Sequence, residues 1–341
     1  MNAQPQDIVV AGQAMRLRPL CPADAPALIG LHNQVFGSGV DRQWFDWKYG
    51  AGSGAGLGIG LWHDGQMIAF CGGVPRQFCL GDLPQTRAAF LQIGDVMVRP
   101  DWRGVLTRRG VFYTVSQAFY DTYIGANAAF AAGFGFPSAR HLQLADKLGL
   151  LRGVGEMVEL TWSSAAATPS DTSLWRWRLQ PITPEQDGFD KTLATCWARM
   201  RQSLPRALLG ERTPAYVRWR FGSRPHAHCE FWALKRPWPS RPLGLLVVSR
   251  PVAGQPCRWL DWIGPAQGLA LAGRMAWRRV QGAGVQQMST WASAEVAALL
   301  GPQAHSQQAA APIGAPTRSL LPSSGSLAMP WWFMAGDTDF L

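Results

Sequence analysis

A short aromatic pattern that occurs twice constrains the fold of this chain more than any other feature. Residues 44–50, WFDWKYG, read aromatic-x-x-Trp-basic-aromatic-Gly, and residues 216–222, YVRWRFG, repeat that order. Two strand-like stretches follow each copy. An aspartate among apolar residues and a proline then appear in both halves, at 94–100 and at 260–265. Two landmarks in the same order favour a duplicated fold over coincidence.

Hydrophobic periodicity places helices and strands in alternation along the first half. The predicted order is β-α-α-β-β-β-α-β-α-β, which indicates an α/β layer architecture. Strands are expected at 15–18, 57–63, 66–80, 87–98, 126–132 and 151–162, and helices after Pro22, at 44–50, after Gly110 and through Leu142 to Leu148. The second half predicts strands at 229–235, 243–250 and 284–291 and helices at 266–281 and 294–300.

The length of 341 residues suits two domains, since a domain usually has about 100–200 residues. The first is expected at 12–163 and the second at 174–341, joined by a Ser-, Ala- and Thr-rich linker at 164–173. Residues 301–330 are rich in Ala, Gln, Pro and Ser and predict a flexible excursion. The apolar residues Trp331 to Met334 then predict a closing strand of the second sheet.

The charge is distributed unevenly between the halves. Residues 1–170 carry 13 basic and 12 acidic residues, whereas residues 171–341 carry 19 and 10 and also hold 12 of the 17 Trp. A basic, aromatic-rich half can face nucleic acid, an acidic sugar or an anionic surface. The sequence has no helix-turn-helix, zinc-finger or RNA-binding signature, so nucleic-acid binding would rest on charge alone and is not expected.

The cysteines and the apolar segments indicate the cellular compartment that we expect for this protein. Six scattered cysteines without a CxxC pair are typical of buried thiols in a reducing environment. Neither a signal peptide nor a membrane-spanning apolar run is visible, so we expect a cytoplasmic protein. His226-x-His228 beside Cys229 resembles half a metal site, but no partner pair exists at metal-finger spacing. We therefore expect no metal.

The basic segment from Arg99 to Gly110 carries the strongest chemical signal. It contains four arginines and two glycines, and it lies between a predicted strand and the N-terminus of a predicted helix. Free N–H groups at a helix start, together with backbone amides in a turn, bind anions. The segment therefore suits a pyrophosphate, although its spacing fits a solvated basic loop equally well.

At this point the sequence resembles the GNAT superfamily of N-acetyltransferases. A strand followed by Val98-x-Pro-x-Trp-Arg-Gly104 is similar to that family's acetyl-CoA loop, and residues 135–150, GFPSARHLQLADKLGL, are similar to its next strand–helix unit. The resemblance covers roughly residues 12–162. With the repeat, it implies an α/β protein of two tandem GNAT-like domains, each a mixed central sheet flanked by helices. The second copy is degenerate, because no Arg-Gly loop follows 260–265.

The resemblance also implies a reaction and a set of site residues. The reaction is acyl transfer from an acyl-CoA, expected to be acetyl-CoA, to an amine of a small molecule or amino sugar by direct attack in a ternary complex. Asp95 is the candidate base, with a structural hydrogen-bond acceptor as the alternative interpretation. His141 and Asp337 are candidates for the acceptor side. The residues expected to bind the cofactor are Val96, Met97, Val98, Arg103, Gly104, Val105, Leu106, Thr107, Arg108, Arg109 and Gly110.

Three departures from the family pattern weigh against a fully standard enzyme. Leu106 stands where the compact family loop has its second glycine, and Ser138 replaces the usual asparagine at the following helix start. Ala145 stands where a tyrosine often protonates the leaving thiolate. The alternative hypothesis is therefore a non-catalytic binding protein that holds an anionic ligand on its basic C-terminal half. The sequence indicates no oligomeric state.

Overall fold

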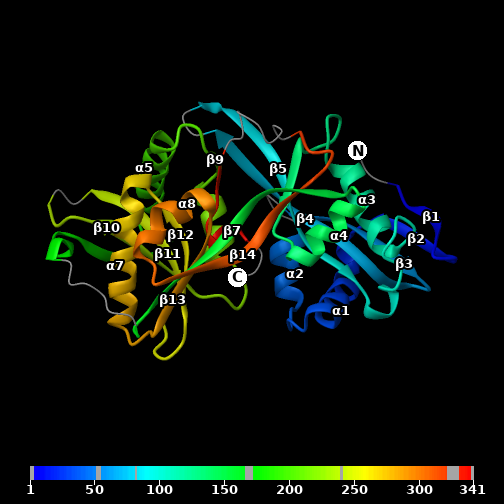
Figure 1. The fold of residues 1–341 in the computed structure, drawn as a ribbon, viewed down its shortest axis with the longest axis horizontal. Helices are drawn as coiled ribbons and strands as arrows, with labels where there is room; N and C mark the ends of the chain where they lie inside the picture. The colour runs from blue at the N-terminus through cyan, green and yellow to red at the C-terminus, as the bar shows by residue number, and fades with distance from the viewer. Residues whose placement is uncertain are drawn as a thin grey trace. The chain divides into compact units, whose positions relative to one another are not determined.

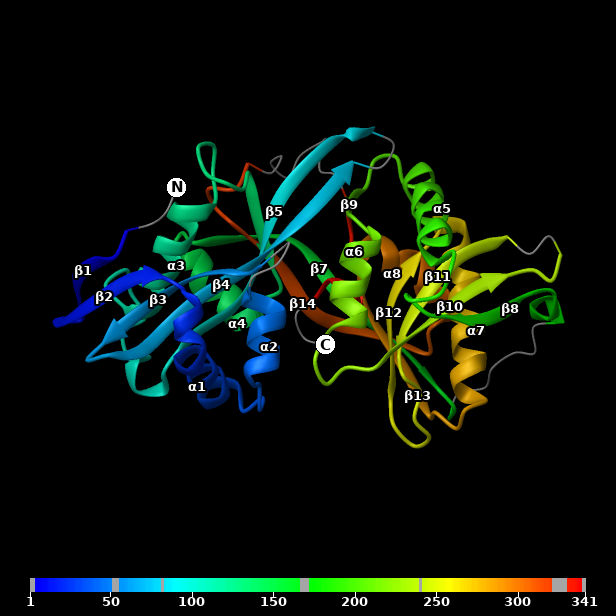
Figure 2. The same ribbon diagram turned by 180° about the vertical axis from the view of Figure 1, so that it is seen from behind.

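The computed structural model describes residues 4–50, 55–80, 83–165, 172–238, 241–320 and 330–338, and it divides into two compact units. Unit 1 comprises residues 1–77, 88–154 and 312–327, and unit 2 comprises residues 78–87, 155–311 and 328–341. Four of the divisions fall within single strands, after Gln77, Arg87, Val154 and Ala311. Figures 1 and 2 show the chain from opposite sides.

Unit 1 is a mixed sheet with helices on both faces. Its elements are β1 (Gln6–Val10), β2 (Gln13–Pro19), α1 (Ala25–Phe36), α2 (Arg42–Tyr49), β3 (Leu57–His63), β4 (Gln66–Leu80), β5 (Leu83–Val98), α3 (Val111–Tyr123), β6 (Ala132–Gly135), α4 (Ala139–Lys147) and the first part of β7 (Leu151–Ser163). Strands β1 to β4 pair antiparallel in sequence order, with β5 beside β4. Strand β6 then pairs parallel with β5, and Gly314 of β14 (Ser306–Pro316) pairs antiparallel with Gly135 of β6.

Two apolar clusters hold the helices of unit 1 onto the sheet. On one face, Leu28 and Leu31 of α1 and Phe45 of α2 pack with sheet residues that include Met97. On the other face, the helices α3 and α4 pack over residues such as Val98. Residues of β5 therefore contact the helices on both faces of the sheet. Helices α3 and α4 begin on the same face.

Unit 2 repeats this plan. Its elements are β8 (Arg178–Ile182), α5 (Phe189–Ser203), β9 (Leu208–Gly210), α6 (Pro214–Val217) with a π-helical turn (Arg218–Gly222), β10 (Cys229–Lys235), β11 (Pro242–Ser249), β12 (Cys257–Ile263), α7 (Leu269–Gln281), β13 (Gln287–Ser293), α8 (Ala294–Leu300) and β15 (Trp331–Trp332). Strands β8, β10, β11 and β12 pair antiparallel, β13 joins β12 in parallel, and β7 joins β13 antiparallel. Each sheet thus has an antiparallel series, one parallel pair spanned by a helix, and a final antiparallel strand.

The duplicated architecture predicted from the repeat is confirmed, and two local predictions are wrong. The strand expected at 126–132 lies instead at Ala132–Gly135, because residues 125–128 form a turn in which Ala128 donates to the Gly125 carbonyl. The flexible excursion expected at 301–330 contains β14, because its Gly314 pairs with Gly135 of β6 and so joins this stretch to the sheet. Residues 321–329 lie outside the described part of the chain, as do 166–171 of the expected linker.

Further expectations concern the terminus, the cysteines and membrane helices. Trp331 and Trp332 form a strand that pairs parallel with β9, away from the strands that the prediction gave it, and Met334 forms a single bridge to Ala292 of β13. All six cysteines are free; four are buried, Cys229 is half-buried and Cys21 is exposed. In the described ranges, none of the helices is both long and apolar enough to cross a membrane.

Candidate functional site

The candidate site in unit 1 begins where β5 leaves its parallel partner. Pairing with β6 runs from Phe90–Ala132 to Ile93–Gly135 and ends there. At Asp95 the backbone takes the left-handed conformation, with φ of 51°, which is uncommon for a residue other than glycine. Strand β5 then continues to Val98, while the chain after β6 turns at Pro137 into α4. Residues 96–98 therefore lie beyond the paired part of the two strands.

The side chains of this strand segment are committed to packing. Met97 is buried beneath α1 and α2, whereas Val98 is buried and Val96 half-buried on the α3 side. Any ligand that these three residues hold is therefore held by backbone N–H and C=O groups. This arrangement is consistent with the role that the sequence predicts for them.

Two of the four loop arginines stabilise the loop itself. The Arg99 guanidinium donates to Asp101 through Nε and Nη2, at 3.1 and 2.6 Å, and to Gln66 Oε1. Arg103 Nε donates to the Val98 carbonyl at 2.9 Å, which holds the loop against the end of β5. Arg108 and Arg109 are exposed and pair with no carboxylate in the described residues. These two side chains are therefore the ones available to an anion.

Gly110 is required by a close approach within the loop. A Cβ at this position would lie 1.9 Å from the Val105 carbonyl oxygen, so no other residue fits without a change in the loop. Gly110 is also the N-cap of α3, and its carbonyl accepts the Thr114 N–H at 3.1 Å. A Cβ at Gly104, in contrast, would meet nothing within 4 Å. The loop is thus built around Gly110.

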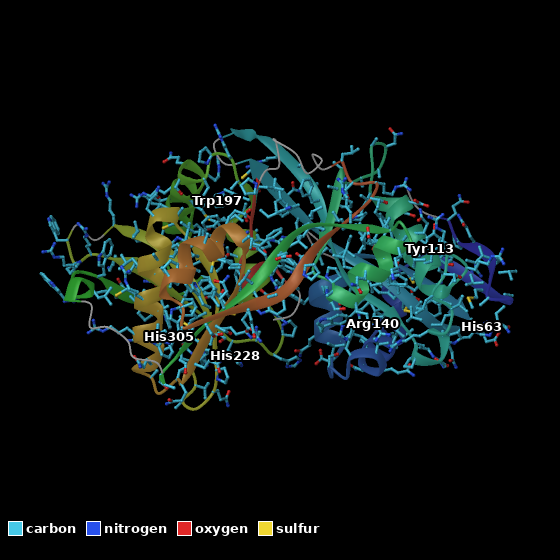
Figure 3. All side chains as sticks on the ribbon, viewed as in Figure 1. His63, Tyr113, Arg140, Trp197, His228 and His305 are labelled. Carbon is cyan, nitrogen blue, oxygen red and sulfur yellow. The ribbon has the colours of Figure 1, made fainter. Side chains whose placement is uncertain are left out.

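The N–H groups around this turn suit an anion. Residues 103–109 are exposed, and the amides of 104–108 make no backbone hydrogen bond in the described part of the chain. The first-turn N–H groups of α3 lack an intrahelical acceptor and carry the positive end of the helix dipole. A hollow of about 360 Å³ extends from Arg108 along α3, past Tyr113 and Gln117. Tyr113 and Arg140, labelled in Figure 3, lie on α3 and α4.

Asp95 lies in a buried network that the sequence did not predict. Lys48 Nζ lies 2.8 Å from its Oδ2, the Tyr49 hydroxyl donates to the same oxygen at 2.5 Å, and His32 Nε2 lies 3.6 Å from Oδ1. Burial by itself raises the pKa of Asp95, but Lys48 and His32 outweigh it and hold that pKa well below its usual range. The lysine and tyrosine belong to the repeated motif at 44–50, whereas nothing in the sequence marked His32.

This environment does not fit Asp95 as the catalytic base. A carboxylate whose pKa is strongly lowered takes up a proton only in strong acid, and the Asp95 carboxylate is already paired with the Lys48 ammonium group. The alternative interpretation, a structural hydrogen-bond acceptor, fits the observed contacts. Its counterpart Asp261 is fully buried and contacts Arg212 Nε at 2.7 Å.

The two acceptor-side candidates lie in different units, His141 in unit 1 and Asp337 in unit 2. Asp337 is fully buried in unit 2, where its carboxylate contacts Arg212 Nη2 at 2.7 Å and accepts the Met334 N–H, so it presents no surface to a substrate. His141 lies on α4 with its ring against Phe112, and its buried Nε2 has no hydrogen-bond partner in the described residues. Burial lowers the pKa of His141. Residue 145 is an alanine and therefore has no side-chain hydroxyl, and it is fully buried in the core.

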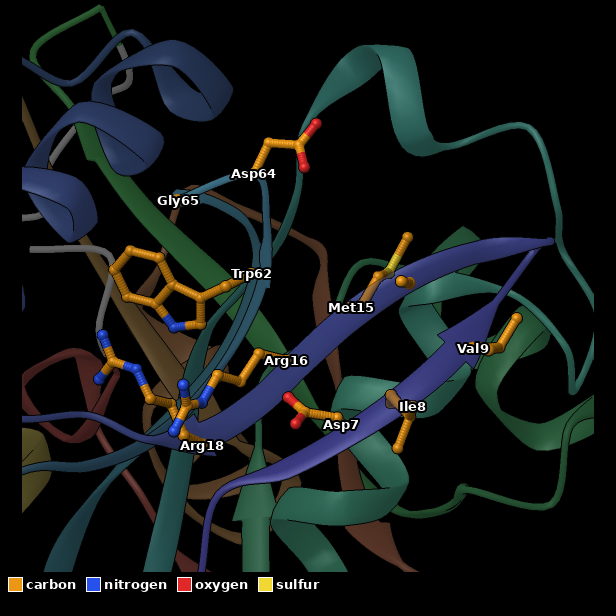
Figure 4. Close-up of a pocket in the computed structure, with 10 residues that line it drawn as sticks. Asp7, Ile8, Val9, Met15, Arg16, Arg18, Trp62, Asp64 and Gly65 are labelled. Carbon is orange, nitrogen blue, oxygen red and sulfur yellow. The ribbon is translucent and has the colours of Figure 1, made fainter.

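A second hollow in unit 1 contains none of the predicted site residues. It measures about 710 Å³ and is lined by β1, β2 and the β3–β4 turn (Figure 4). The Arg18 guanidinium stacks over the Trp62 ring at 4.3 Å and also forms two 2.7 Å hydrogen bonds with Asp24. These contacts explain the fixed position of Arg18 at the edge of the sheet.

Comparison with solved structures defines the class of this fold. The chain is similar to a probable N-acyltransferase of unknown function from Enterococcus faecalis V583, with a TM-score of 0.63 at 13% identity over 89% of this chain and 73% of that one. It is also similar to a GCN5-related N-acetyltransferase from Anabaena variabilis, with a TM-score of 0.61 at 13% identity over 90% of this chain and 74% of that one. A tandem GNAT protein from the clavulanic acid biosynthesis pathway has a TM-score of 0.54 to this chain, at 12% identity over 89% of this chain and 98% of that one.

These likenesses show that the chain has the GNAT fold, as two tandem GNAT-like domains. Neither a protein-family model nor a curated protein matches its sequence.

Proposed function

We propose that this chain is an acyl-CoA-dependent N-acyltransferase whose donor, expected to be acetyl-CoA, binds in unit 1. The observation that carries the proposal is the Gly110 turn. It holds a series of exposed backbone N–H groups at the start of α3, with Arg108 and Arg109 beside them. Such a turn suits the pyrophosphate of coenzyme A, because successive N–H groups and a helix N-terminus both favour negative charge.

The end of β5 that extends beyond its pairing with β6 suits the remainder of the donor. Backbone groups of Val96, Met97 and Val98 would hydrogen-bond the pantetheine arm, and an N–H among them would stabilise the oxyanion that forms on the thioester carbonyl. The amine nitrogen attacks the acyl carbon directly, the C–S bond breaks, and coenzyme A leaves as the thiolate. Holding the amine and the thioester together supplies much of the rate acceleration.

The acceptor is proposed to be an amine of a small molecule or amino sugar. The amine must lose a proton during the reaction, and Asp95 is not proposed for this role because Lys48 neutralises it. The leaving thiolate is expected to take its proton from water, because Ala145 offers no hydroxyl.

Calorimetric titration with acetyl-CoA tests the donor site. Wild-type protein is expected to bind with a micromolar dissociation constant, and Arg108→Ala/Arg109→Ala is expected to weaken binding by about tenfold or more, because it removes two charge-assisted contacts to phosphate. Arg103 is left intact, since its side chain holds the loop to Val98.

The matched control is Arg178→Ala/Arg206→Ala, which removes the same charge from exposed positions of unit 2. Its affinity for acetyl-CoA should equal that of wild type. A flat wild-type titration, or equal weakening in both double variants, would overturn the proposal. Product formation with a panel of amines then tests catalysis.

The second candidate function is a GNAT-fold protein that binds an anionic ligand without catalysis. Two observations favour it: the alanine at the position of the family's tyrosine, and a strongly basic hollow in unit 2. Acetyl-CoA binding without turnover of any amine would support this alternative.

A further inference from the structure

The basic hollow in unit 2 has a volume of about 350 Å³. It lies between the end of the π-helical turn, the loop that leads to β10, and the neighbouring ends of β11 and β12. None of its residues belongs to the donor site proposed above, and all of them lie in unit 2. Figure 3 labels His228, one of the lining residues.

Three arginines contribute to the lining of this hollow, beside neutral residues such as Phe221 and Ser249. The lining includes Arg220, Arg224, Arg258, His226 and His228, and no Asp or Glu stands among the described residues that form it. The exposed Arg258 side chain forms no ion pair with any carboxylate in the described part of the chain. Guanidinium groups match the oxygen geometry of phosphate, and a low-dielectric wall strengthens their attraction for an anion.

The hollow is also held in shape. Arg220 is only 4% exposed, and its guanidinium donates to the Gly336 carbonyl at 2.8 Å and to the Thr338 carbonyl. The Arg258 N–H donates to Ser249 Oγ at 2.8 Å, which ties β12 to the end of β11. His226 has φ of 58°, a left-handed conformation that is uncommon for a residue other than glycine and persists only where its surroundings fix it. The site is therefore built before a ligand arrives.

The one thiol in the wall does not oppose an anion. Burial raises the pKa of Cys229 to about 11, even though the nearby Arg220 and Arg224 lower it. The thiol therefore stays neutral near pH 7.

We propose that this hollow binds the phosphate group of a small phosphate-bearing molecule. Two or three arginines around a single concave site provide charge and directed donors, and the volume accepts one phosphate with a small attached group. The site stands on unit 2 alone, so it exists whether or not unit 1 transfers an acyl group.

Thermal unfolding with inorganic phosphate at constant ionic strength, set with sodium chloride, tests the site. Wild-type protein is expected to gain stability as phosphate rises, because a ligand that binds only the folded state stabilises it. Arg224→Ala/Arg258→Ala is expected to need about tenfold more phosphate for the same effect, since it loses two charge-assisted contacts. The phosphate response of Arg224→Lys/Arg258→Lys should fall between those of wild type and the alanine variant. The positive charges remain, but the planar guanidinium groups and their paired N–H donors are lost.

Two controls separate this site from general charge effects and from coenzyme A. Arg178→Ala/Arg206→Ala, with the same charge change, should respond to phosphate as wild type does. Arg108→Ala/Arg109→Ala should also keep the phosphate response while losing acetyl-CoA affinity. No phosphate response in wild type, a response equal in all variants, or loss of the response in Arg108→Ala/Arg109→Ala would overturn the proposal. If the alanine variant does not fold, undiminished affinity in the lysine variant would overturn it.

Discussion

The two units differ most at the junction between the central strand and the following helix. In unit 1 the β5–α3 junction is an exposed loop that turns at Gly110. In unit 2 the β12–α7 junction is closed by the Trp262 indole, which donates to the Pro265 carbonyl at 3.1 Å. A Cβ on Gly264 would lie 2.6 Å from that ring. One junction is thus an exposed loop, while an indole ring fills the other.

The aspartates before these junctions differ in how their charge is balanced. Asp95 contacts a lysine and a histidine, whereas Asp261 shares Arg212 with a second buried carboxylate, Asp337. Burial raises the pKa of Asp261, and Asp337 adds to that rise against the opposing effect of Arg212. A buried aspartate is therefore common to both units and serves their structure. The exposed loop that is proposed to bind the donor belongs to unit 1, and the β12–α7 junction of unit 2 has no counterpart to it.

Replacing Arg212 should have the largest effect on stability. Arg212→Met leaves two buried carboxylates without their cation, and we expect the free energy of unfolding to fall by about 3–5 kcal/mol. Urea denaturation measures it, with the exposed Arg206→Met as the control, which should stay within about 0.5 kcal/mol of wild type. A loss at Arg212 as small as that of the control would show that its ion pairs contribute little.

The two aspartates should respond unequally to the same substitution. Asp95→Asn leaves Lys48 buried without its carboxylate, whereas Asp261→Asn relieves the repulsion from Asp337. At pH 7 we expect Asp95→Asn to cost about 2 kcal/mol more than Asp261→Asn, within the range for broken buried pairs. Equal losses in urea denaturation would mean that the charge balance of the two networks is the same.

The Gly110 turn should control donor affinity more than stability. Gly110→Ala forces the loop away from the Val105 carbonyl, so we expect about tenfold weaker binding of acetyl-CoA, equivalent to about 1.4 kcal/mol. Gly104→Ala, which enters open space, is the matched control and should bind within about twofold of wild type. Calorimetry decides the point, and equal affinities for both variants would remove Gly110 from the proposed site.

The pH dependence of stability should show opposite signs for the two aspartates. The pKa of Asp95 is lowered by folding, so its stabilisation is present above the ordinary value near 4 and is lost as the pH falls below it. We expect a loss of about 1 kcal/mol from this group between pH 4 and pH 3, absent in Asp95→Asn. Asp261, with a raised pKa, should contribute the opposite slope. Unfolding measured at pH 5, 4 and 3 tests both, and parallel curves for the two Asn variants would contradict it.

The sequence predicted the site in part. The basic residues, the glycine and the position between strand and helix were visible in residues 99–110, because anion-binding turns depend on local backbone chemistry. The Lys48–Asp95 pair was present only as two separate landmarks of the repeat. Nothing local could show that Asp95 is neutralised, or that Asp337 near the terminus is buried beside Arg212.

By itself, the sequence determined the duplicated α/β plan and most of its elements, because hydrophobic periodicity and turn residues act within a few positions along the chain. Only the tertiary structure decided that β14 completes the sheet of unit 1 and that most of β7 belongs to unit 2. Strand partners are chosen by packing and hydrogen bonding between residues far apart in sequence. In β14, the pairing of Gly314 with Gly135 places a stretch that reads as a flexible excursion at the edge of β6.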